Sequence, residues 1–203
     1  MITIIDYGVG NLASVLNILK RINVEAEITS DKDRILNATK ILLPGVGAFD
    51  NAVTQIQEYG FTDLLNKKVL EDKVPVLGIC LGMQLLTRES EEGKLKGFGW
   101  IDAKTVKFSF QPEQKLKIPH MGWNEVLPKR TSPLTTGFEP NSRFYFVHSY
   151  HVVANNPSDV VMTSYYGYEF HSVVQHGNIY GAQFHPEKSH KFGMKLLTNF
   201  SNL

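Results

Sequence analysis

Val74-Pro75-Val76-Leu77-Gly78-Ile79-Cys80-Leu81-Gly82-Met83-Gln84-Leu85-Leu86 is the stretch that decides the fold. It places the only cysteine of the chain, Cys80, midway between Gly78 and Gly82 and directly after an apolar run. This G-x-C-x-G pattern is the thiol version of the G-x-S-x-G nucleophile elbow, a sharp turn that joins a strand to a helix. The glycines permit the tight turn and the close packing of strand and helix. The pattern therefore predicts a thiol raised into a cleft near a helix N-terminus, where the helix dipole favours the thiolate.

The first half of the chain alternates strand and helix patterns around this elbow. Strands are expected at 2–6, 25–29, 40–43 and 74–79, and helices at 12–21, 31–37, 52–59 and 61–71. This alternation predicts an α/β fold with a mostly parallel central sheet flanked by helices. The second half predicts extra antiparallel strands at 105–108, 125–127, 144–151, 160–165, 172–176 and 179–184, and a closing helix at 191–200. No repeat or linker interrupts the chain, so a single domain over residues 1–203 is expected.

Composition excludes several classes of function. The chain has 203 residues and a formal net charge of +1, which gives no reason to expect a nucleic acid or an anionic membrane as partner. No apolar stretch approaches the roughly 20 residues needed to span a bilayer. The first residues read as a strand rather than as a signal peptide. A single cysteine permits no internal disulfide, so a cytoplasmic protein is expected.

A nucleophilic cysteine needs a base, and the base needs an orienting group. Both occur in Gln183-Phe184-His185-Pro186-Glu187-Lys188. Residues i and i+2 of an extended segment point the same way, and the proline favours extended backbone before it. The Glu187 carboxylate can then set the tautomer of His185, whose other nitrogen takes the proton of Cys80. We predict a Cys80-His185-Glu187 triad for acyl transfer, although an isolated His-x-Glu would more often be a surface pair and a lone cysteine a buried apolar residue.

Acyl transfer also needs hydrogen-bond donors for the developing oxyanion. The backbone N–H of Leu81 lies at the start of the predicted helix. The turn Pro44-Gly45-Val46-Gly47 follows the predicted third strand and so emerges at the same edge of the sheet as Cys80. We expect amides around Val46 and Gly47 to supply the second donor.

Neither a cofactor nor a metal is expected. Gly8-x-Gly10 follows the first strand, as in a dinucleotide-binding turn, and Ala13 is a permitted third position. Such matches are common, and the cysteine elbow explains the same cleft better. His148 and His151 lack cysteine partners or a clear third ligand for a metal.

The elbow and the His185-Pro186-Glu187 segment resemble those of class I glutamine amidotransferases. Within that family, the chain is similar nearly end to end to the glutaminase subunits of imidazole glycerol phosphate synthase. The stretches that carry this similarity are Ile5-Asp6-Tyr7-Gly8-Val9-Gly10-Asn11, Leu43-Pro44-Gly45-Val46-Gly47-Ala48-Phe49, Pro119-His120-Met121-Gly122-Trp123-Asn124-Glu125-Val126, Tyr145-Phe146-Val147-His148-Ser149-Tyr150 and His185-Pro186-Glu187-Lys188-Ser189.

This resemblance implies hydrolysis of L-glutamine to glutamate and ammonia, with the ammonia channelled to a (β/α)8-barrel cyclase subunit in a heterodimer of histidine biosynthesis. It implies that Cys80 forms the glutamyl thioester and that Gln84, Ser149 and Tyr150 bind glutamine. It also implies an oxyanion hole of backbone around Val46, Gly47 and Leu81. The positions that match partner-facing ones in relatives are Asn11, Met121, Trp123, Tyr145 and Lys188, although the two aromatics could be core residues and the lysine a solvated charge.

Two alternatives to the histidine-pathway glutaminase stay open. The resemblance is looser at 97–104, 165–171 and 190–195, and paralogous amidotransferases in surface-sugar biosynthesis supply ammonia to a different acceptor. A catalytically silent subunit that merely binds its partner is the other alternative, and the intact Cys80, His185 and Glu187 argue against it. A protease or another hydrolase that uses the same elbow is a weaker possibility.

Overall fold

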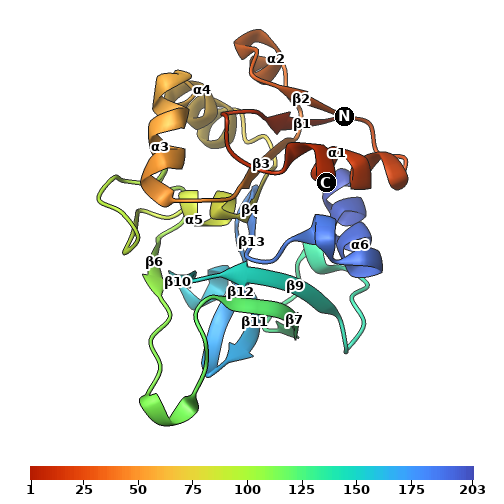
Figure 1. Ribbon diagram of the computed structural model, residues 1–203. Helices are drawn as coiled ribbons and strands as arrows, with labels where there is room; N and C mark the ends of the chain where they lie inside the picture. Colours follow the sequence, from red (N-terminus) through yellow and green to blue (C-terminus); the bar gives the residue numbers. More distant parts are fainter.

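Five parallel strands form the centre of the main sheet in the computed structural model, which describes all residues 1–203 (Figure 1). In spatial order they are β2 (Ala26–Thr29), β1 (Ile2–Ile5), β3 (Ile41–Gly45), β4 (Val76–Cys80) and β13 (Ile179–Ala182). Each of the four neighbouring pairs is parallel. The sheet is thus the mostly parallel one expected, and the strand that ends at Cys80 lies between two others.

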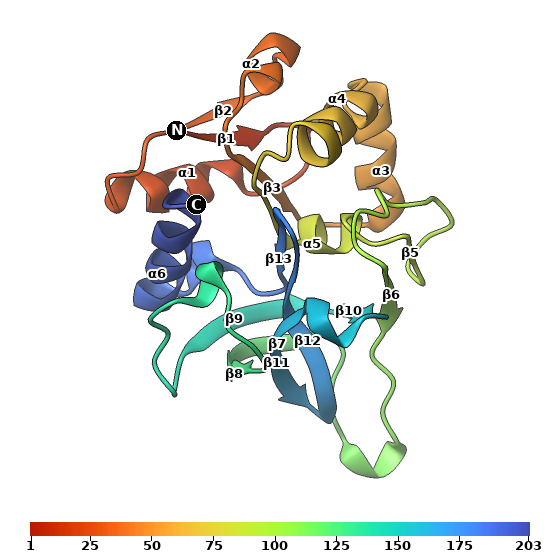
Figure 2. The same ribbon diagram turned by 180° about the vertical axis from the view of Figure 1, so that it is seen from behind.

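The same sheet continues as antiparallel strands beyond β13. They are β12 (Tyr168–His176), β10 (Tyr150–Ala154) and β6 (Ala103–Lys107); the short β5 (Glu89–Ser90) then pairs with β6 in parallel. β11 (Val160–Tyr166) pairs with β12, and β8 (Leu127–Pro128) pairs with β11. A long connection between β6 and the next strand protrudes from the molecule in both views and carries the short turn Pro112–Gln114 (Figures 1 and 2).

Helices cover both faces of the parallel part. They are α1 (Leu12–Arg21), α2 (Lys32–Leu36), α3 (Phe49–Glu58), α4 (Thr62–Asn66), which continues as a π-helical turn (Lys67–Glu71), α5 (Leu81–Leu85) and α6 (His190–Ser201). α1 and α6 lie together on one face, and α3 and α4 lie on the other (Figure 2). No helix is long and apolar enough to cross a membrane.

Alternating side chains of the central strands feed two separate hydrophobic clusters. On β3, Leu43 packs in the cluster beneath α3 and α4, whereas Leu42 packs in the cluster beneath α1 and α6. On β4, Val76 and Leu77 divide in the same way. Period-two alternation with both faces buried is the mark of a parallel sheet covered by helices.

A separate two-stranded sheet lies against the antiparallel half of the main sheet. Because of it, two of the strands predicted from the sequence differ from those in the structure. The two-stranded sheet consists of β7 (His120–Glu125) paired with β9 (Arg143–His148). The strand predicted at 125–127 is wrong, because β7 ends there and β8 begins two residues later in the other sheet. The strand predicted at 144–151 is two strands, since the chain passes from the small sheet to the main sheet at Ser149. A continuous apolar pattern does not reveal a change of partner strand.

Aromatic and histidine rings fill the space between the two sheets. The ring centroid of Phe108 lies 5.2 Å from that of His148, 4.7 Å from that of His151 and 5.4 Å from that of Phe170. Burial lowers the pKa of His120 and of His151 to about 4 each, and it lowers the pKa of His148 well below its ordinary value. These rings therefore pack as neutral side chains at neutral pH.

The elbow glycines are required by close contact of helix and strand. A Cβ added to Gly82 would collide with the carbonyl oxygen of Leu43 on β3, and one added to Gly78 would meet the backbone of Gly82. The backbone of α5 thus rests directly on β3 and β4, as the sequence pattern predicts.

Replacing Gly82 by Ala should destabilise the protein by about 3 kcal/mol or more, because overpacking in a rigid backbone contact cannot relax cheaply. Urea unfolding measures the change. Gly177→Asn is the control, since Gly177 has open space around it and a positive φ that asparagine tolerates. Equal stability of the two variants would contradict the packing argument.

Lowering the pH from about 6.5 to about 4 should destabilise the protein steeply. Unfolded histidines bind a proton near pH 6.5, but folded His120 and His151 do so only near pH 4. The unfolded state therefore binds more protons in this window, so the stabilisation present above pH 6.5 is lost on acidification, at about 1.4 kcal/mol per pH unit for each histidine. Urea unfolding as a function of pH measures the slope. His151→Phe should reduce it, and an unchanged slope would contradict the assignment.

Candidate active site

Cys80 occupies a strained turn at the carboxyl end of β4. Its φ of 54° and ψ of −109° lie in a region that non-glycine residues rarely adopt, at a cost of about 1–3 kcal/mol. α5 begins at the next residue. The side chain is buried, with 7% of the residue exposed. Strain at the central residue is the expected property of a nucleophile elbow.

His185 and Glu187 reach the cysteine from the segment that follows β13, the strand beside β4. The Nδ1 atom of His185 lies 2.8 Å from Oε1 of Glu187, and both side chains are almost fully buried. A carboxylate can only accept, so Nδ1 carries a hydrogen and the acid fixes the orientation of the ring. The second ring nitrogen of His185, Nε2, is buried and has no hydrogen-bond partner. The Cys80 thiol lies beside this ring.

The neighbours of His185 favour its protonated form. Burial lowers its pKa, but the adjacent Cys80 and Glu187 outweigh burial and raise the pKa to about 10. The imidazole can therefore hold a proton at neutral pH next to the sulfur. This is the arrangement that a cysteine nucleophile with a histidine acid–base requires.

A cavity of about 330 Å³ opens in front of the cysteine. Of the residues predicted for the site, it brings together Val46, Gly47, Cys80, Leu81, Gln84, Ser149, Tyr150, His185 and Lys188. Glu187 lies behind His185 and does not line it. The residues that sequence reasoning missed are Glu92, Pro119, Val147 and His148.

The glycine turn after β3 lies beside the nucleophile because Gly45 pairs with Cys80 in the sheet. Gly47 has a φ of +99°, and Val46 is 43% exposed at the mouth of the cavity. The hydroxyl of the buried Tyr7 donates a 2.6 Å hydrogen bond to the carbonyl of Pro44. Burial raises the pKa of Tyr7, which keeps this donor protonated. The turn is thus anchored at its first residue and open at its tip.

Gln84 ties one wall of the cavity to the nucleophile. Its Nε2 donates to the carbonyl of Tyr150 at 3.1 Å and to Oε1 of Gln183 at 3.3 Å. The amide of Gln183 in turn donates to the Cys80 sulfur at 3.7 Å. Gln84 and Gln183 are both buried.

Glu92 is a carboxylate in the cavity that the sequence does not mark. Its Oε2 accepts a 3.0 Å hydrogen bond from the N–H of Phe49 at the start of α3. Burial raises its pKa. In the sequence, Glu91-Glu92 reads as an ordinary charged surface pair, because the chain turn that brings it to the cavity leaves no local signal.

The residues predicted to face a partner are mostly on one surface. Met121 and Trp123 on β7 are 62% and 45% exposed, and Tyr145 of β9 lies opposite Trp123. Lys188 lies over the Tyr145 ring, 5.7 Å from its centroid. The ring of His190, which the sequence did not single out, stacks on Trp123 at 5.4 Å.

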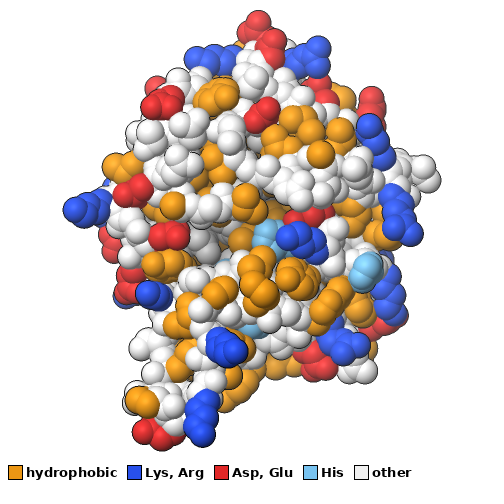
Figure 3. Space-filling model, in the orientation of Figure 1, with side chains coloured by type: hydrophobic (Ala, Val, Ile, Leu, Met, Phe, Trp, Pro, Cys, Tyr) orange, Lys and Arg blue, Asp and Glu red, His pale blue; other side chains and the backbone are white.

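We call Met121, Trp123 and Tyr145 the outer face of the small sheet. Figure 3 shows hydrophobic side chains gathered over β7 and β9 on this side of the molecule. The outer face adjoins the cavity, since Lys188 and Val147 belong to the cavity lining. The other predicted residue, Asn11, caps α1 by accepting from the N–H of Ser14 at 3.4 Å.

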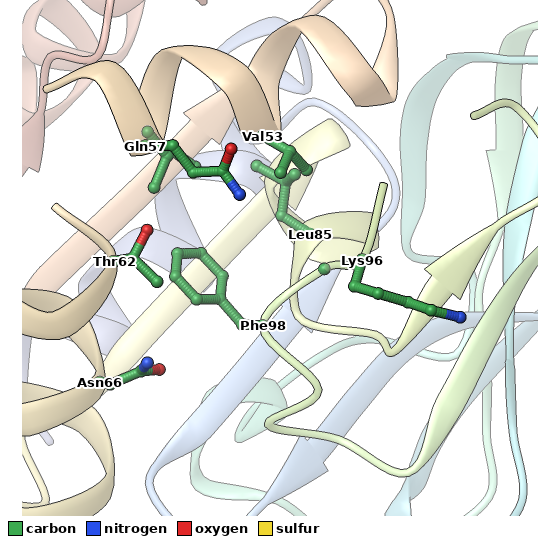
Figure 4. Close-up of a pocket in the computed structure, with 9 residues that line it drawn as sticks. Val53, Gln57, Thr62, Asn66, Leu85, Lys96 and Phe98 are labelled. Carbon is green, nitrogen blue, oxygen red and sulfur yellow. The ribbon is translucent and has the colours of Figure 1, made fainter. Parts of the chain in front are cut away.

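A second, smaller cavity of about 100 Å³ lies away from this site, between α3, α4 and α5. In Figure 4 Thr62 and Asn66 lie to one side of the ring of Phe98, and Gln57, Val53 and Leu85 lie above it. It contains none of the residues predicted from the sequence. Nowhere in the structure do three or more His, Cys, Asp or Glu side chains gather to hold a metal ion.

Comparison with known proteins identifies the family. The model of the family described as "Glutamine amidotransferase class-I" matches residues 3–202. The chain belongs to the class I glutamine amidotransferase family. The predicted resemblance to class I glutamine amidotransferases is therefore confirmed.

Relatives of this amidotransferase match it along its whole length. It is 56% identical over 200 residues to a Methanococcus maripaludis protein named imidazole glycerol phosphate synthase subunit HisH 2, with 98% of each chain covered. It is 48% identical to the HisH 2 protein of Pseudomonas aeruginosa, with 100% of each chain covered. A solved glutamine amidotransferase superimposes with a TM-score of 0.73 over 99% of both chains at 18% identity, which confirms the fold.

Proposed function

We propose that this chain is the glutaminase subunit of an imidazole glycerol phosphate synthase and that residues 1–203 form one amidotransferase domain. The observation that carries the proposal is the buried Cys80-His185-Glu187 arrangement at a strained elbow, open to a cavity of about 330 Å³ that is large enough for an amino acid. The full-length similarity to proteins named HisH supports the assignment to this synthase. A cytoplasmic enzyme of histidine biosynthesis follows from that assignment.

The cavity offers groups of the right charge for L-glutamine. We assign the α-ammonium group of the substrate to Glu92, because Glu92 is the one carboxylate among the residues that line the cavity. Gln84, Ser149 and Tyr150 also line the cavity and would hold the rest of the amino-acid end. The side-chain amide then points toward Cys80. This placement leaves the reacting carbon between the sulfur and the glycine turn.

The chemistry needs only groups of the chain and a water molecule. The Cys80 thiolate attacks the amide carbon, and the N–H groups of Leu81 and of the Val46–Gly47 turn stabilise the oxyanion. His185 donates its proton to the departing nitrogen, so ammonia and a glutamyl thioester form. Water then attacks the thioester while His185 takes its proton, which releases glutamate and restores the thiolate. Glu187 holds the ring in place through both halves of the reaction.

The outer face of the small sheet would bind a (β/α)8-barrel cyclase subunit. Ammonia released into water at neutral pH is mostly protonated and is then no longer a nucleophile. A partner seated on Met121 and Trp123 would cover the cavity mouth beside Lys188 and receive ammonia before it reaches solvent. Asn11 and Tyr145 would complete the contact.

A second candidate differs only in the acceptor of the ammonia. Both relatives described above carry the number 2 in their names, and a paralogue that serves another synthase would keep every residue of the glutaminase site. The nucleotide that stimulates the enzyme therefore decides between the two.

The first test is glutamate release from glutamine by the purified chain, alone and with the cyclase subunit plus its nucleotide substrate. Strong stimulation by the pair is expected. Activity that is indifferent to the nucleotide would favour the paralogue, and no activity in any mixture would favour the silent subunit.

Cys80→Ala should abolish glutamine-dependent turnover but leave complex formation and ammonia-dependent cyclase turnover intact. Loss of the ammonia-dependent reaction in this variant would contradict the donor role.

Replacing Glu187 by Gln should lower the kcat of glutamine hydrolysis by about 10²–10⁴-fold, because an amide NH₂ facing Nδ1 favours the wrong tautomer of His185. Steady-state glutamate release at saturating glutamine measures the effect. Glu139→Gln is the matched control, since Glu139 is an exposed residue paired with Lys191 on the surface. Near-normal kcat in the Glu187 variant would exclude the carboxylate from the triad.

A further inference from the structure

A chain of hydrogen bonds runs through the buried histidines from the small sheet to the wall of the cavity. Nδ2 of Asn124 lies 3.2 Å from Nε2 of His120, and Nδ1 of His120 lies 3.0 Å from Nε2 of His148. Nδ1 of His148 lies 2.7 Å from the carbonyl oxygen of Tyr150. Both histidines are buried, with 3% and 5% of each residue exposed.

The end of this chain at Tyr150 fixes the tautomer of both rings. A carbonyl can only accept, so Nδ1 of His148 carries the hydrogen and Nε2 of the neutral ring accepts. Nδ1 of His120 must then donate, and its Nε2 accepts from the Asn124 amide. Asn124 cannot turn its amide over, because its Nδ2 also donates to the carbonyl of Tyr165 and its Oδ1 accepts from the N–H of Glu125. Every donor thus meets an acceptor in one arrangement only.

The Tyr150 carbonyl is held from two sides. It accepts from His148 at 2.7 Å and from Gln84 at 3.1 Å, which uses both of its lone pairs. Gln84 continues through Gln183 to the Cys80 sulfur. His148 lines the cavity, but both of its ring nitrogens are already engaged. It therefore has no free polar atom to offer a ligand, and it acts on the cavity through Tyr150.

We propose that His148, oriented by His120, is a positioning residue that sets the Ser149–Tyr150 wall of the cavity for glutamine. This inference rests on the proposed glutaminase activity. Ser149 is the single residue between β9 and β10, which belong to different sheets, and its backbone is held only through its carbonyl, which accepts from the N–H of Phe108 at 3.0 Å. The His148 side chain bridges this break by bonding back to the residue that begins β10. Without the bridge, the wall keeps only the bonds from Gln84 to Tyr150 and from Phe108 to Ser149 and is held less firmly, while the triad, held elsewhere, stays intact.

The strand pairing places the His120 and His148 rings next to each other, in position for this hydrogen-bonded bridge. His120 and His148 face each other as a register pair of β7 and β9. Along β7, His120 and Asn124 point inward, whereas Met121 and Trp123 point outward. The rings are therefore shielded from the outer face, and their effect on the site passes through hydrogen bonds rather than through direct contact with a partner.

The test compares two substitutions at position 148 in the active complex with its partner. His148→Leu removes the donor to Tyr150 and should raise the KM for glutamine by about tenfold, with kcat changed less than threefold. His148→Asn places an amide N–H at the position of Nδ1 and should return the KM to within about threefold of wild type. Thermal unfolding of both variants shows whether the fold is kept.

Several outcomes would overturn the inference. Equal increases of KM in the Leu and Asn variants, or an unchanged KM in both, would mean that His148 only packs in the core and does not position the wall through its hydrogen bond. If His148→Leu does not fold, the same comparison is made with His120→Leu and His120→Asn, whose amide can still donate to His148. Glutamine binding to these variants in a Cys80→Ala background, measured by calorimetry, gives the same answer without turnover. An inactive wild-type complex would instead contradict the proposed function.

Discussion

The bare backbone contact between α5 and β3 is the constraint on which the site depends. Because Gly82 presents no side chain, the helix lies directly against the Leu43 carbonyl. The chain can then reverse within one residue after β4, which leaves Cys80 with a positive φ and lifts the thiol out of the sheet. The same contact brings α5 close enough for Gln84 to reach the wall on β10. The position of Cys80 and the contact of Gln84 with the cavity wall thus both depend on the close packing of α5 against β3.

The small sheet holds the other half of the site. The N–H of His185 donates to the Tyr145 carbonyl at 2.9 Å, and the N–H of Tyr145 donates to the Ser189 hydroxyl at 3.0 Å. One strand, β9, therefore supports the His185 segment at its middle and the His148 bridge at its end. Cys80 ends one strand of the main sheet, His185 follows another and Tyr150 begins a third, so the small sheet supports the His185 segment and the His148 bridge from outside.

Local spacing explains which features could be predicted from the sequence. The elbow and His185-Pro186-Glu187 are short patterns whose geometry follows from a few adjacent residues, and parallel strand order brings them together. Glu92 and the pair of His120 and His148 depend on pairings between distant segments. The strand β7 escaped prediction because Gly122 and the polar inward residues hide its alternation. The break at Ser149 escaped because both flanking segments are equally β-like.

The passage of the chain from one sheet to the other at Ser149 has a thermodynamic consequence. A tilt of the small sheet against the main sheet would have to be absorbed at the two single residues where the chain passes between them, Val126 and Ser149, so the wall of the cavity at Ser149 would move with it. Under the proposed function, any partner that favours one tilt would then change the affinity for glutamine. By linkage, glutamine must change the affinity for that partner by the same factor. Substrate occupancy would in this way be reported to the neighbouring subunit before any ammonia is made.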